Sequence, residues 1–340
     1  MIPHANLALQ TPSWQAQLSG AVREPTALFE LLGLDTGKLP AALRASRDFP
    51  LFVPHAFLAK IRRGDIDDPL LAQVLPRGEE LEIVPGFGTD PVGEQDANPQ
   101  PGLIHKYRGR VLLMASTACP IHCRYCFRRH FPYQDNRPAR DEWQQALSYL
   151  SGDQSIKEVI LSGGDPLTAS DRQLAWLVTR LAAISRIKRL RVHTRFVVAI
   201  PSRITDECLQ WLAGSRLTST MVLHVNHPNE LGDDTLTAVR KLKTAGVDVL
   251  NQSVLLRGVN DDAATLTTLS EKLYDTGILP YYLHMLDPVQ GAAHFAVSEA
   301  RAQELHAALL AALPGYLVPR LVREVPGESS KLAVSSHSPS

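Results

Sequence analysis

Short runs of β-branched and aliphatic residues recur along the later part of the chain, with amphipathic stretches of helical periodicity between them. Most runs begin roughly 30 residues after the one before, which is typical of repeated βα units with a parallel sheet. The runs are RVLLMAST, EVILSGG, RLRVHTR, STMVLHVN, VDVLNQSVLL and PYYLHMLD, beginning near residues 110, 158, 189, 219, 247 and 280. Six such units predict an α/β fold, a curved or incomplete (βα)6 barrel of TIM type.

The N-terminal part has a different pattern. Apolar residues recur at helical spacing over residues 14–34 and again around AFLAKIRRG within residues 56–75, which predicts an N-terminal helical region over residues 1–80. Residues 81–108 are rich in proline and glycine and are expected to form an extended connector. The barrel core with its C-terminal segment then covers residues 109–334, and the Ser-rich end, residues 335–340, is expected to be a disordered tail.

Composition narrows the function classes. The 340 residues include 35 Lys and Arg against 35 Asp and Glu, so the formal net charge is zero. Without a basic excess, neither nucleic acid nor an anionic membrane is favoured as a partner. The N-terminus lacks a cationic start followed by an apolar run, and no window approaches the roughly 18 apolar residues of a membrane span. We expect a cytoplasmic protein whose partner is a small molecule or another protein.

Three of the four cysteines lie together in the stretch CPIHCRYC, as Cys119, Cys123 and Cys126, whereas Cys208 is far away. This is not the paired framework of a secreted protein, so it favours a reducing compartment and a metal. Three thiolates can hold three corners of a tetrahedral site or three irons of a cubane cluster. From spacing alone, a zinc site completed by His122 or Cys208 and a set of plain buried cysteines both remain open.

Residues able to do chemistry stand where the predicted strands end. In barrels of this kind the active site lies at the C-terminal ends of the strands. The residues are Cys119, Gly163, Gly164, Asp165, Arg195, Asn226, Gln252 and Asp287. Their order predicts a single active mouth.

The Cys-x3-Cys-x2-Cys spacing, with the aromatic Tyr125 before the last cysteine, resembles the motif of radical S-adenosylmethionine (radical SAM) enzymes. The resemblance implies an incomplete (βα)6 TIM-type barrel of the radical SAM kind with an N-terminal helical region. It also implies that Cys119, Cys123 and Cys126 bind a [4Fe-4S] cluster whose fourth iron binds S-adenosyl-L-methionine and cleaves it to a 5′-deoxyadenosyl radical.

The stretch SGGDPL follows the second predicted strand and contains Gly163, Gly164 and Asp165. It resembles the glycine-rich segment with which the same enzymes meet the methionyl amino group of S-adenosylmethionine. Glycine lets a backbone approach a ligand closely, although a strand-to-helix turn also uses glycines for its own geometry.

Longer stretches resemble the lysine 2,3-aminomutase family, from about residue 80 to Lys331. They are PGLIHKYRGRVLL, CRYCFRRHFPY, SGGDPL, LNQSVLLRGVND, PYYLHMLDPVQGAAHF and REVPGESSK. The resemblance implies an isomerase that converts free L-lysine to β-lysine by a radical 1,2-amino migration assisted by pyridoxal 5′-phosphate.

Within this family, RRHFPY and VQGAAHF resemble the branch that supplies β-lysine for modification of bacterial translation elongation factor P. The implied partners are L-lysine, a reductant such as flavodoxin or ferredoxin, and functionally elongation factor P and its lysyl ligase.

The resemblance also assigns site residues. Lys331, in PGESSK, stands at the pyridoxal lysine, and Arg128 stands at the arginine that binds the substrate carboxylate. Asp287 and Glu324 stand at the two acids that hold the ε-ammonium group, although the family has aspartate at the second position. Gln252 stands at a residue near S-adenosylmethionine.

Each assignment has a plainer structural alternative. Lys331 could be a solvated charge in a Ser-rich segment. Arg128 could be a surface arginine, and Asp287 could cap a helix before Pro288. Gln252 could be a buried strand glutamine bonded to backbone.

Two other functions remain open. One is a radical SAM aminomutase that acts on glutamate or another amino acid, for which the acids at positions 287 and 324 would be dispensable. The other is a metal-stabilised binding module without catalysis, which would not cleave S-adenosylmethionine.

Overall fold

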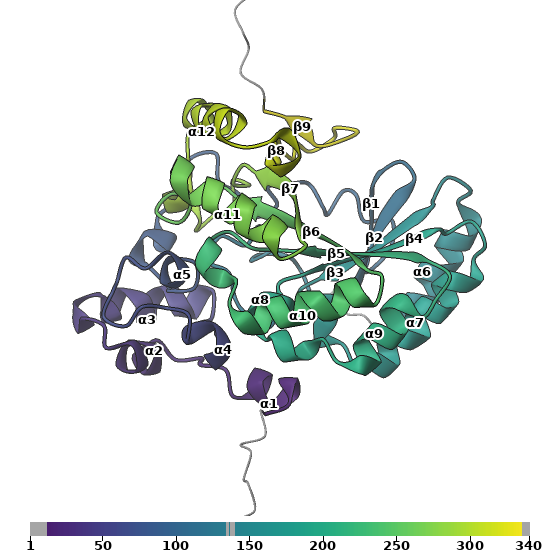
Figure 1. Ribbon diagram of the computed structural model, residues 1–340, viewed down its shortest axis with the longest axis horizontal. Helices are drawn as coiled ribbons and strands as arrows, with labels where there is room; N and C mark the ends of the chain where they lie inside the picture. The colour runs from purple at the N-terminus through teal and green to yellow at the C-terminus, as the bar shows by residue number, and fades with distance from the viewer. Residues whose placement is uncertain (1–11, 134–135, 137–139, 335–340) are drawn as a thin grey trace, which may run out of the picture.

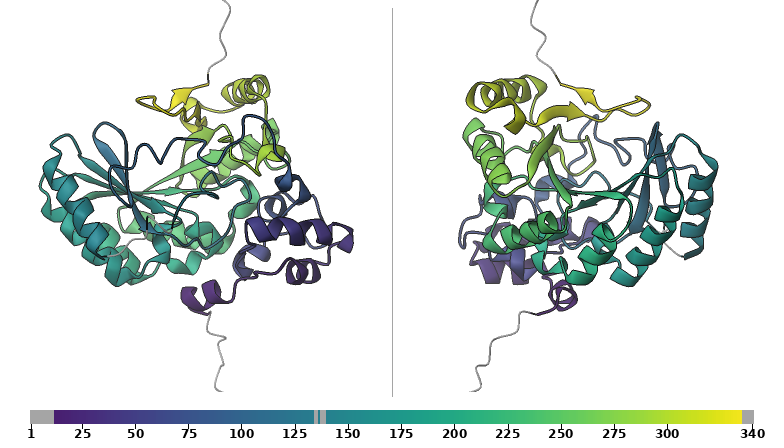
Figure 2. Two further views of the ribbon diagram at one scale, coloured as in Figure 1. Left: turned by 180° about the vertical axis from the view of Figure 1, so that it is seen from behind. Right: turned by 45° about the vertical axis from the view of Figure 1, so that its right-hand side comes forward.

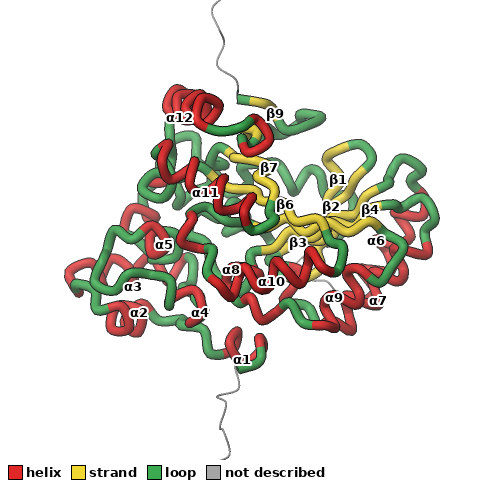
Figure 3. Tube along the Cα trace, in the orientation of Figure 1, coloured by secondary structure: helices red, strands yellow, loops and turns green. Residues whose placement is uncertain are grey.

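A computed structural model describes residues 12–133, 136 and 140–334. The predicted tail, residues 335–340, lies outside the described residues. Within them the chain forms an α/β fold with one curved sheet, whose long helices lie against one face (Figures 1 and 2). Strand and helix alternate along most of its length, as Figure 3 shows by colour.

The six predicted runs are six strands of this sheet. They are β2 Arg110–Ser116, β3 Glu158–Gly163, β4 Arg189–Thr194, β5 Thr218–Leu223, β6 Asp248–Val254 and β7 Leu279–His284. These strands pair side by side, parallel and in chain order. The prediction of an incomplete α/β barrel is confirmed, because the sheet is open at both edges.

Three short strands extend the sheet beyond the prediction. β1 Leu103–Tyr107 forms an antiparallel hairpin with β2, and it lies within the predicted connector 81–108. β8 Arg320–Arg323 adds a further parallel strand beside β7, and β9 Leu332–Ala333 pairs antiparallel with β8. The division into domains stays a prediction.

The helices that follow the strands cover one face of the sheet (Figure 1). They are α6 Arg140–Gly152, α7 Asp171–Ala183, α8 Phe196–Ala199, α9 Asp206–Ala213, α10 Asp233–Thr244, α11 Ala263–Asp275 and α12 Glu299–Ala312. Alternate strand residues such as Val159 and Leu161 pack with Leu174 and Leu177 of α7 in one apolar core. Because strand side chains alternate between faces, the intervening strand residues point to the opposite side of the sheet.

The N-terminal region consists of short helices rather than the long ones that the pattern predicts. They are α1 Trp14–Ser19, α2 Pro25–Leu32, α3 Leu39–Asp48, α4 His55–Leu58 and α5 Pro69–Ala72. The predicted helix over residues 14–34 is interrupted, because Gly20 caps α1 and Pro25 opens α2. Trp14 meets Phe196 of α8 edge-on at 5.6 Å between ring centroids, so this region shares the core of the sheet.

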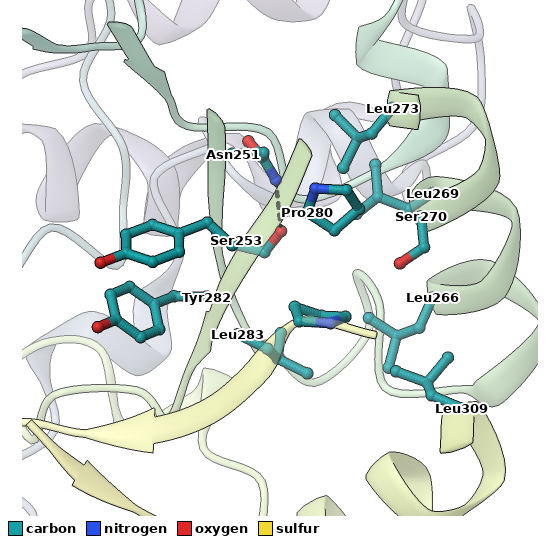
Figure 4. Close-up of a pocket in the computed structure, with 12 residues that line it drawn as sticks. Asn251, Ser253, Leu266, Leu269, Ser270, Leu273, Pro280, Tyr282, Leu283 and Leu309 are labelled. Atoms are coloured by element: carbon teal, nitrogen blue, oxygen red, sulfur yellow. Dashed lines mark hydrogen bonds between the residues drawn. The ribbon is translucent and has the colours of Figure 1, made fainter. Parts of the chain in front are cut away.

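A small cavity of about 10 Å³ lies between β6, β7 and α11 (Figure 4). Its lining includes three leucines of α11 together with Asn251 and Ser253, whose side chains hydrogen-bond at 2.9 Å. A space of this size holds at most one water molecule. This cavity is therefore too small for a substrate, and none of the candidate site residues at the strand ends lines it.

Candidate active site

The three clustered cysteines lie on the loop after β2, where the sequence predicts them to be. All three are partly buried. Burial, followed by the neighbouring cysteines, raises the pKa of the Cys119 thiol well above its ordinary value, and burial raises the pKa of Cys126 to about 11. Such thiols stay protonated unless a metal binds them.

The same loop bears on which metal centre fits. In the described part of the chain, no three His, Cys, Asp or Glu side chains converge closely enough to hold one metal ion. A cubane cluster distributes its thiolate ligands over separate irons. Three cysteines can each bind one iron of such a cluster.

A buried polar network lies beneath the loop. Arg195, which follows β4, has one nitrogen 2.6 Å from the Cys123 sulfur and also donates to the Tyr125 hydroxyl. Its second nitrogen donates to Gln73 Oε1 at 2.7 Å and to Glu230 Oε2 at 3.1 Å. Arg195 and Glu230 are almost fully buried, so the ion pair is shielded from water. Tyr125 is thus held by the protein beside a cysteine.

Gly163 and Gly164 let β3 end very close to the cysteine loop. Gly163 has a φ of 122°, and a Cβ atom on it would lie 2.2 Å from the Ser116 carbonyl oxygen. A Cβ atom on Gly164 would lie 2.4 Å from the Ala118 carbonyl oxygen. The glycines are therefore required here by close backbone contact, whatever they contribute to a ligand.

Asp165 joins the ends of β3 and β4. Its carboxylate accepts hydrogen bonds from the Thr194 hydroxyl, at 2.9 Å to each oxygen, and from the backbone of Arg195 at 2.8 Å and of Leu167 at 3.0 Å. Burial raises its pKa to about 6 despite these bonds. The side chain is therefore held in place by the ends of both strands.

Arg128 is buried, not on the surface. Its Nε and Nη2 donate to the two oxygens of Glu94 at 2.7 and 2.6 Å, and its Nη1 donates to Ser162 Oγ and the Gly163 carbonyl, both at 3.0 Å. Four of its five N–H groups are engaged. Glu94 lies in the predicted connector and was missed by the sequence reasoning.

Lys331 and Glu324 meet across the β8–β9 hairpin. Glu324 follows β8 and Lys331 precedes β9, and Arg323 pairs with Leu332. The Lys331 ammonium nitrogen lies 2.5 Å from Glu324 Oε2, and Lys106 Nζ lies 2.8 Å from Glu324 Oε1. Burial acts to raise the pKa of Glu324, but the two lysines outweigh it and hold the pKa at about 2. Lys106, on β1, was missed by the sequence reasoning.

Asp287 follows β7 and faces the same group. Burial, then the negative charge of Glu324, raises its pKa to about 7, while the charges of Lys331 and Lys106 oppose the shift. It caps none of the described helices, so the alternative of a helix cap is wrong. Asp287 and Glu324, the two acids that the resemblance assigns to the ε-ammonium group, thus lie near each other and near Lys331, and their role stays a prediction.

Two histidines near Lys331 have no protein partner for one ring nitrogen. The Nε2 atoms of His193, on β4, and His284, on β7, are buried and accept or donate no hydrogen bond within the described residues. Burial, with the charge of Lys331 among the further causes, lowers the pKa of both, that of His284 to about 3. Buried polar atoms without partners are rare in folded proteins, so these fit a site completed by a ligand.

Gln252 lies on the same side of the sheet as these histidines. Its neighbours Asn251 and Ser253 face α11, so strand alternation turns Gln252 to the other side. It pairs with Tyr282 of β7, two residues before His284.

The chain is similar to known proteins over nearly its whole length. The model of the radical SAM superfamily matches residues 114–268. The L-lysine 2,3-aminomutases of Escherichia coli and Haemophilus influenzae are 49% and 47% identical, covering 96% and 97% of this chain and 96% and 98% of the relatives. The enzyme of Clostridium subterminale is 31% identical over 94% of this chain and 77% of its own length.

Solved structures are more distant. A radical SAM methyltransferase from Sphaerobacter thermophilus has a TM-score of 0.47 and 18% identity, covering 65% of this chain and 68% of its own.

None of the described helices is both long and apolar enough to cross a membrane.

The similarity to these relatives assigns the chain to their family. Membership in the family implies three cofactors: a [4Fe-4S] cluster, S-adenosyl-L-methionine and pyridoxal 5′-phosphate. The partly buried cysteines, the ligand-free imidazole nitrogens and the lysine–glutamate pair fit these groups. The alternative of a binding module without catalysis is thereby replaced by an enzyme. The chain belongs to the lysine 2,3-aminomutase family of radical SAM isomerases.

Proposed function

We propose that this enzyme is an L-lysine 2,3-aminomutase that converts free α-lysine to β-lysine. The names of the relatives support this substrate. The observation that carries the proposal is the group at the end of the sheet, where Lys331 contacts Glu324 and Asp287 lies beside them. Lys331 supplies an amine that can bind a cofactor covalently, and the two acids can bind the ammonium group of a lysine substrate.

Cys119, Cys123 and Cys126 are proposed to bind the cluster. Tyr125, Gly163, Gly164, Asp165 and Gln252 are proposed to line the S-adenosylmethionine site, and Lys331 to bind pyridoxal phosphate. When bound, these groups supply an electron, a hydrogen-abstracting radical and the conjugated system across which an amino group migrates.

The chain's own residues then bind and orient the substrate. Glu324, ionised at any pH near neutrality, attracts the ε-ammonium group, and Asp287 becomes a second anion when that group arrives. Lys331 must lose its proton and its contact with Glu324 before it can act as a nucleophile. The substrate ammonium can take its place on Glu324, which couples lysine binding to release of Lys331.

Arg128 is proposed to bind the substrate carboxylate. Only one of its N–H groups is free of a protein acceptor, so bidentate binding requires Glu94 to move from one guanidinium edge. Neutral His193 and His284, whose Nε2 atoms have no hydrogen-bond partner in the described chain, can donate to or accept from a ligand without adding charge.

The β-lysine that the enzyme forms is proposed to be attached to elongation factor P by the lysyl ligase of that factor. We propose that the reaction takes place in the cytoplasm and that flavodoxin or ferredoxin supplies the electron. The likeness of RRHFPY and VQGAAHF to that branch of the family supports this link. Deleting the gene should remove the β-lysyl mass from elongation factor P, as intact-protein mass spectrometry would show.

The reaction itself is tested by anaerobic incubation of the reconstituted enzyme with lysine, pyridoxal phosphate, S-adenosylmethionine and dithionite. Chromatography should detect β-lysine. A parallel incubation with glutamate is needed, because Lys106 beside Glu324 is a cation that an acidic substrate could use. β-Glutamate without β-lysine would contradict the proposal.

A further inference from the structure

The loop that contains the cysteines has little support of its own. Residues 117–130 form neither helix nor strand. Within the loop, Cys126 N donates to the Cys123 carbonyl at 3.1 Å, and Arg129 N donates to the Cys126 carbonyl at 3.1 Å. Such bonds close single turns but do not fix how the three sulfur atoms stand relative to one another.

Backbone of the N-terminal region holds the loop on both sides of Cys123. The amide of His122 donates to the Phe52 carbonyl at 2.9 Å, and the amide of Arg124 donates to the Gln73 carbonyl at 2.9 Å. These acceptors lie outside the barrel core, in the segment that precedes β1. The loop is thus paired with a region that the radical SAM superfamily model, residues 114–268, does not cover.

Glu80 connects two arginines of the loop through one buried carboxylate. It accepts from Arg124 Nε at 2.8 Å and Nη2 at 2.5 Å, and from Arg129 Nη2 at 3.0 Å. The side chains of all three residues are at most 3% exposed. Arg124 follows Cys123 and Arg129 lies three residues after Cys126, so Glu80 joins the two ends of the Cys123–Cys126 turn.

Gln73 connects the same region to a cysteine sulfur. Its side-chain oxygen accepts from Tyr125 at 3.2 Å, from Arg195 at 2.7 Å and from Asn226 at 3.1 Å. Arg195 in turn contacts the Cys123 sulfur at 2.6 Å. Gln73 is fully buried, so none of these donors has water as a substitute.

We propose that Glu80 and Gln73 are positioning residues for the iron–sulfur cluster, which hold the cysteine loop in its cluster-binding shape from outside the barrel. The inference rests on the proposed role of the three cysteines. Removing the Glu80 charge leaves two buried guanidinium groups without an anion, and the loop must move to hydrate them. Removing the Gln73 oxygen leaves Arg195, beside Cys123, with one hydrogen-bond acceptor fewer.

The test begins with Glu80→Gln, which keeps the size of the side chain. After anaerobic reconstitution and gel filtration, iron and sulfide per chain should fall, with cluster affinity reduced by about tenfold, as for other partners of metal ligands. The matched control is Asp171→Asn, which removes the carboxylate of another buried arginine, Arg203, whose contacts lie away from the loop. This control should retain the iron and sulfide of the wild type.

Gln73→Met provides a second variant that changes no charge. If Glu80→Gln does not fold, this variant alone tests whether the N-terminal region positions the cluster. It should shift the reduction potential and the electron paramagnetic resonance signal of the cluster, which a merely structural role would leave unchanged. Pyridoxal phosphate trapped on Lys331 with borohydride should stay at the wild-type amount. Wild-type iron, sulfide and potential in the folded variants would overturn the inference, whereas a wild type that takes up no cluster would instead overturn the proposed function.

Discussion

The cysteine loop and the Lys331 hairpin both lie at the C-terminal ends of the parallel strands, yet they are built differently. Around the loop, each buried arginine is paired with a buried carboxylate: Arg128 with Glu94, Arg195 with Glu230, and Arg124 and Arg129 with the shared Glu80. Around Lys331, a single carboxylate, Glu324, serves two lysines. Two imidazole nitrogens nearby have no partner in the described chain, and Asp287 has a pKa near 7.

The difference between the cysteine loop and the Lys331 hairpin indicates which kind of ligand each of them suits. Buried ion pairs hold the cysteine loop before any ligand arrives, which suits a cluster that must keep three sulfur atoms in place. The Lys331 end has two buried imidazole nitrogens without a partner in the described chain, so it can gain hydrogen bonds when a substrate binds. Changes at the loop should therefore remove the iron–sulfur cluster, and changes at the hairpin should leave the cluster in place.

The largest effect is expected from Cys126→Ala. With two thiolates left, the cluster has lost a ligand and its electron has no route to S-adenosylmethionine. Cluster absorbance and β-lysine formation should disappear together, measured by visible spectra and chromatography. A variant that forms β-lysine with no iron–sulfur signal would contradict both the cysteine assignment and the radical source.

Lys331→Ala should abolish turnover just as completely but spare the loop. Iron, sulfide and cleavage of S-adenosylmethionine by the reduced enzyme should remain, because the contacts of Lys331 are with Glu324 and not with the cysteine loop. Retention of pyridoxal phosphate after dialysis, measured by absorbance, should be lost. If β-lysine still formed, the cofactor lysine would have to be another residue.

Gly164→Ala tests whether the loop is as tightly built as its contacts indicate. Its Cβ would be 2.4 Å from the Ala118 oxygen and 2.7 Å from the Ala118 carbonyl carbon, both backbone atoms next to Cys119. Overpacking of this kind costs about 1–3 kcal/mol, measured by urea unfolding of the apoprotein. Gly152→Ala is the control, because nothing lies within 4 Å of its added Cβ. Equal stability of the two variants would show that the loop yields easily.

The sequence predicted the strands that position this site better than the side-chain contacts within it. The six long strands follow from recurring β-branched and aliphatic runs, but β8 and β9 have only four and two residues, too few to stand out as such a run. Lys331 was placed by resemblance, since a lysine in a polar segment has no pattern of its own. The contacts of Glu94 and Lys106 depend on how the connector folds back over the strand ends, which no local pattern encodes. His193 carried a weak signal, because it stands on the opposite side of its strand from the buried Leu190 and Val192.

The smallest expected effect is also the most specific, and it concerns the pKa of Asp287. A raised pKa means that the folded enzyme binds this proton more tightly than an exposed aspartate does, so below pH 7 the group is largely neutral and attracts the lysine ammonium weakly. As pH rises through about 7 the carboxylate forms, and kcat/KM for lysine should rise about tenfold between pH 6 and pH 8 before it levels off. Glu324, with its pKa at about 2, stays ionised throughout and contributes no such change. In Asp287→Asn this rise should vanish while cluster content stays at the wild-type level. A variant that kept the wild-type pH profile would place the titrating group elsewhere, and the hairpin would then bind lysine through Glu324 without help from Asp287.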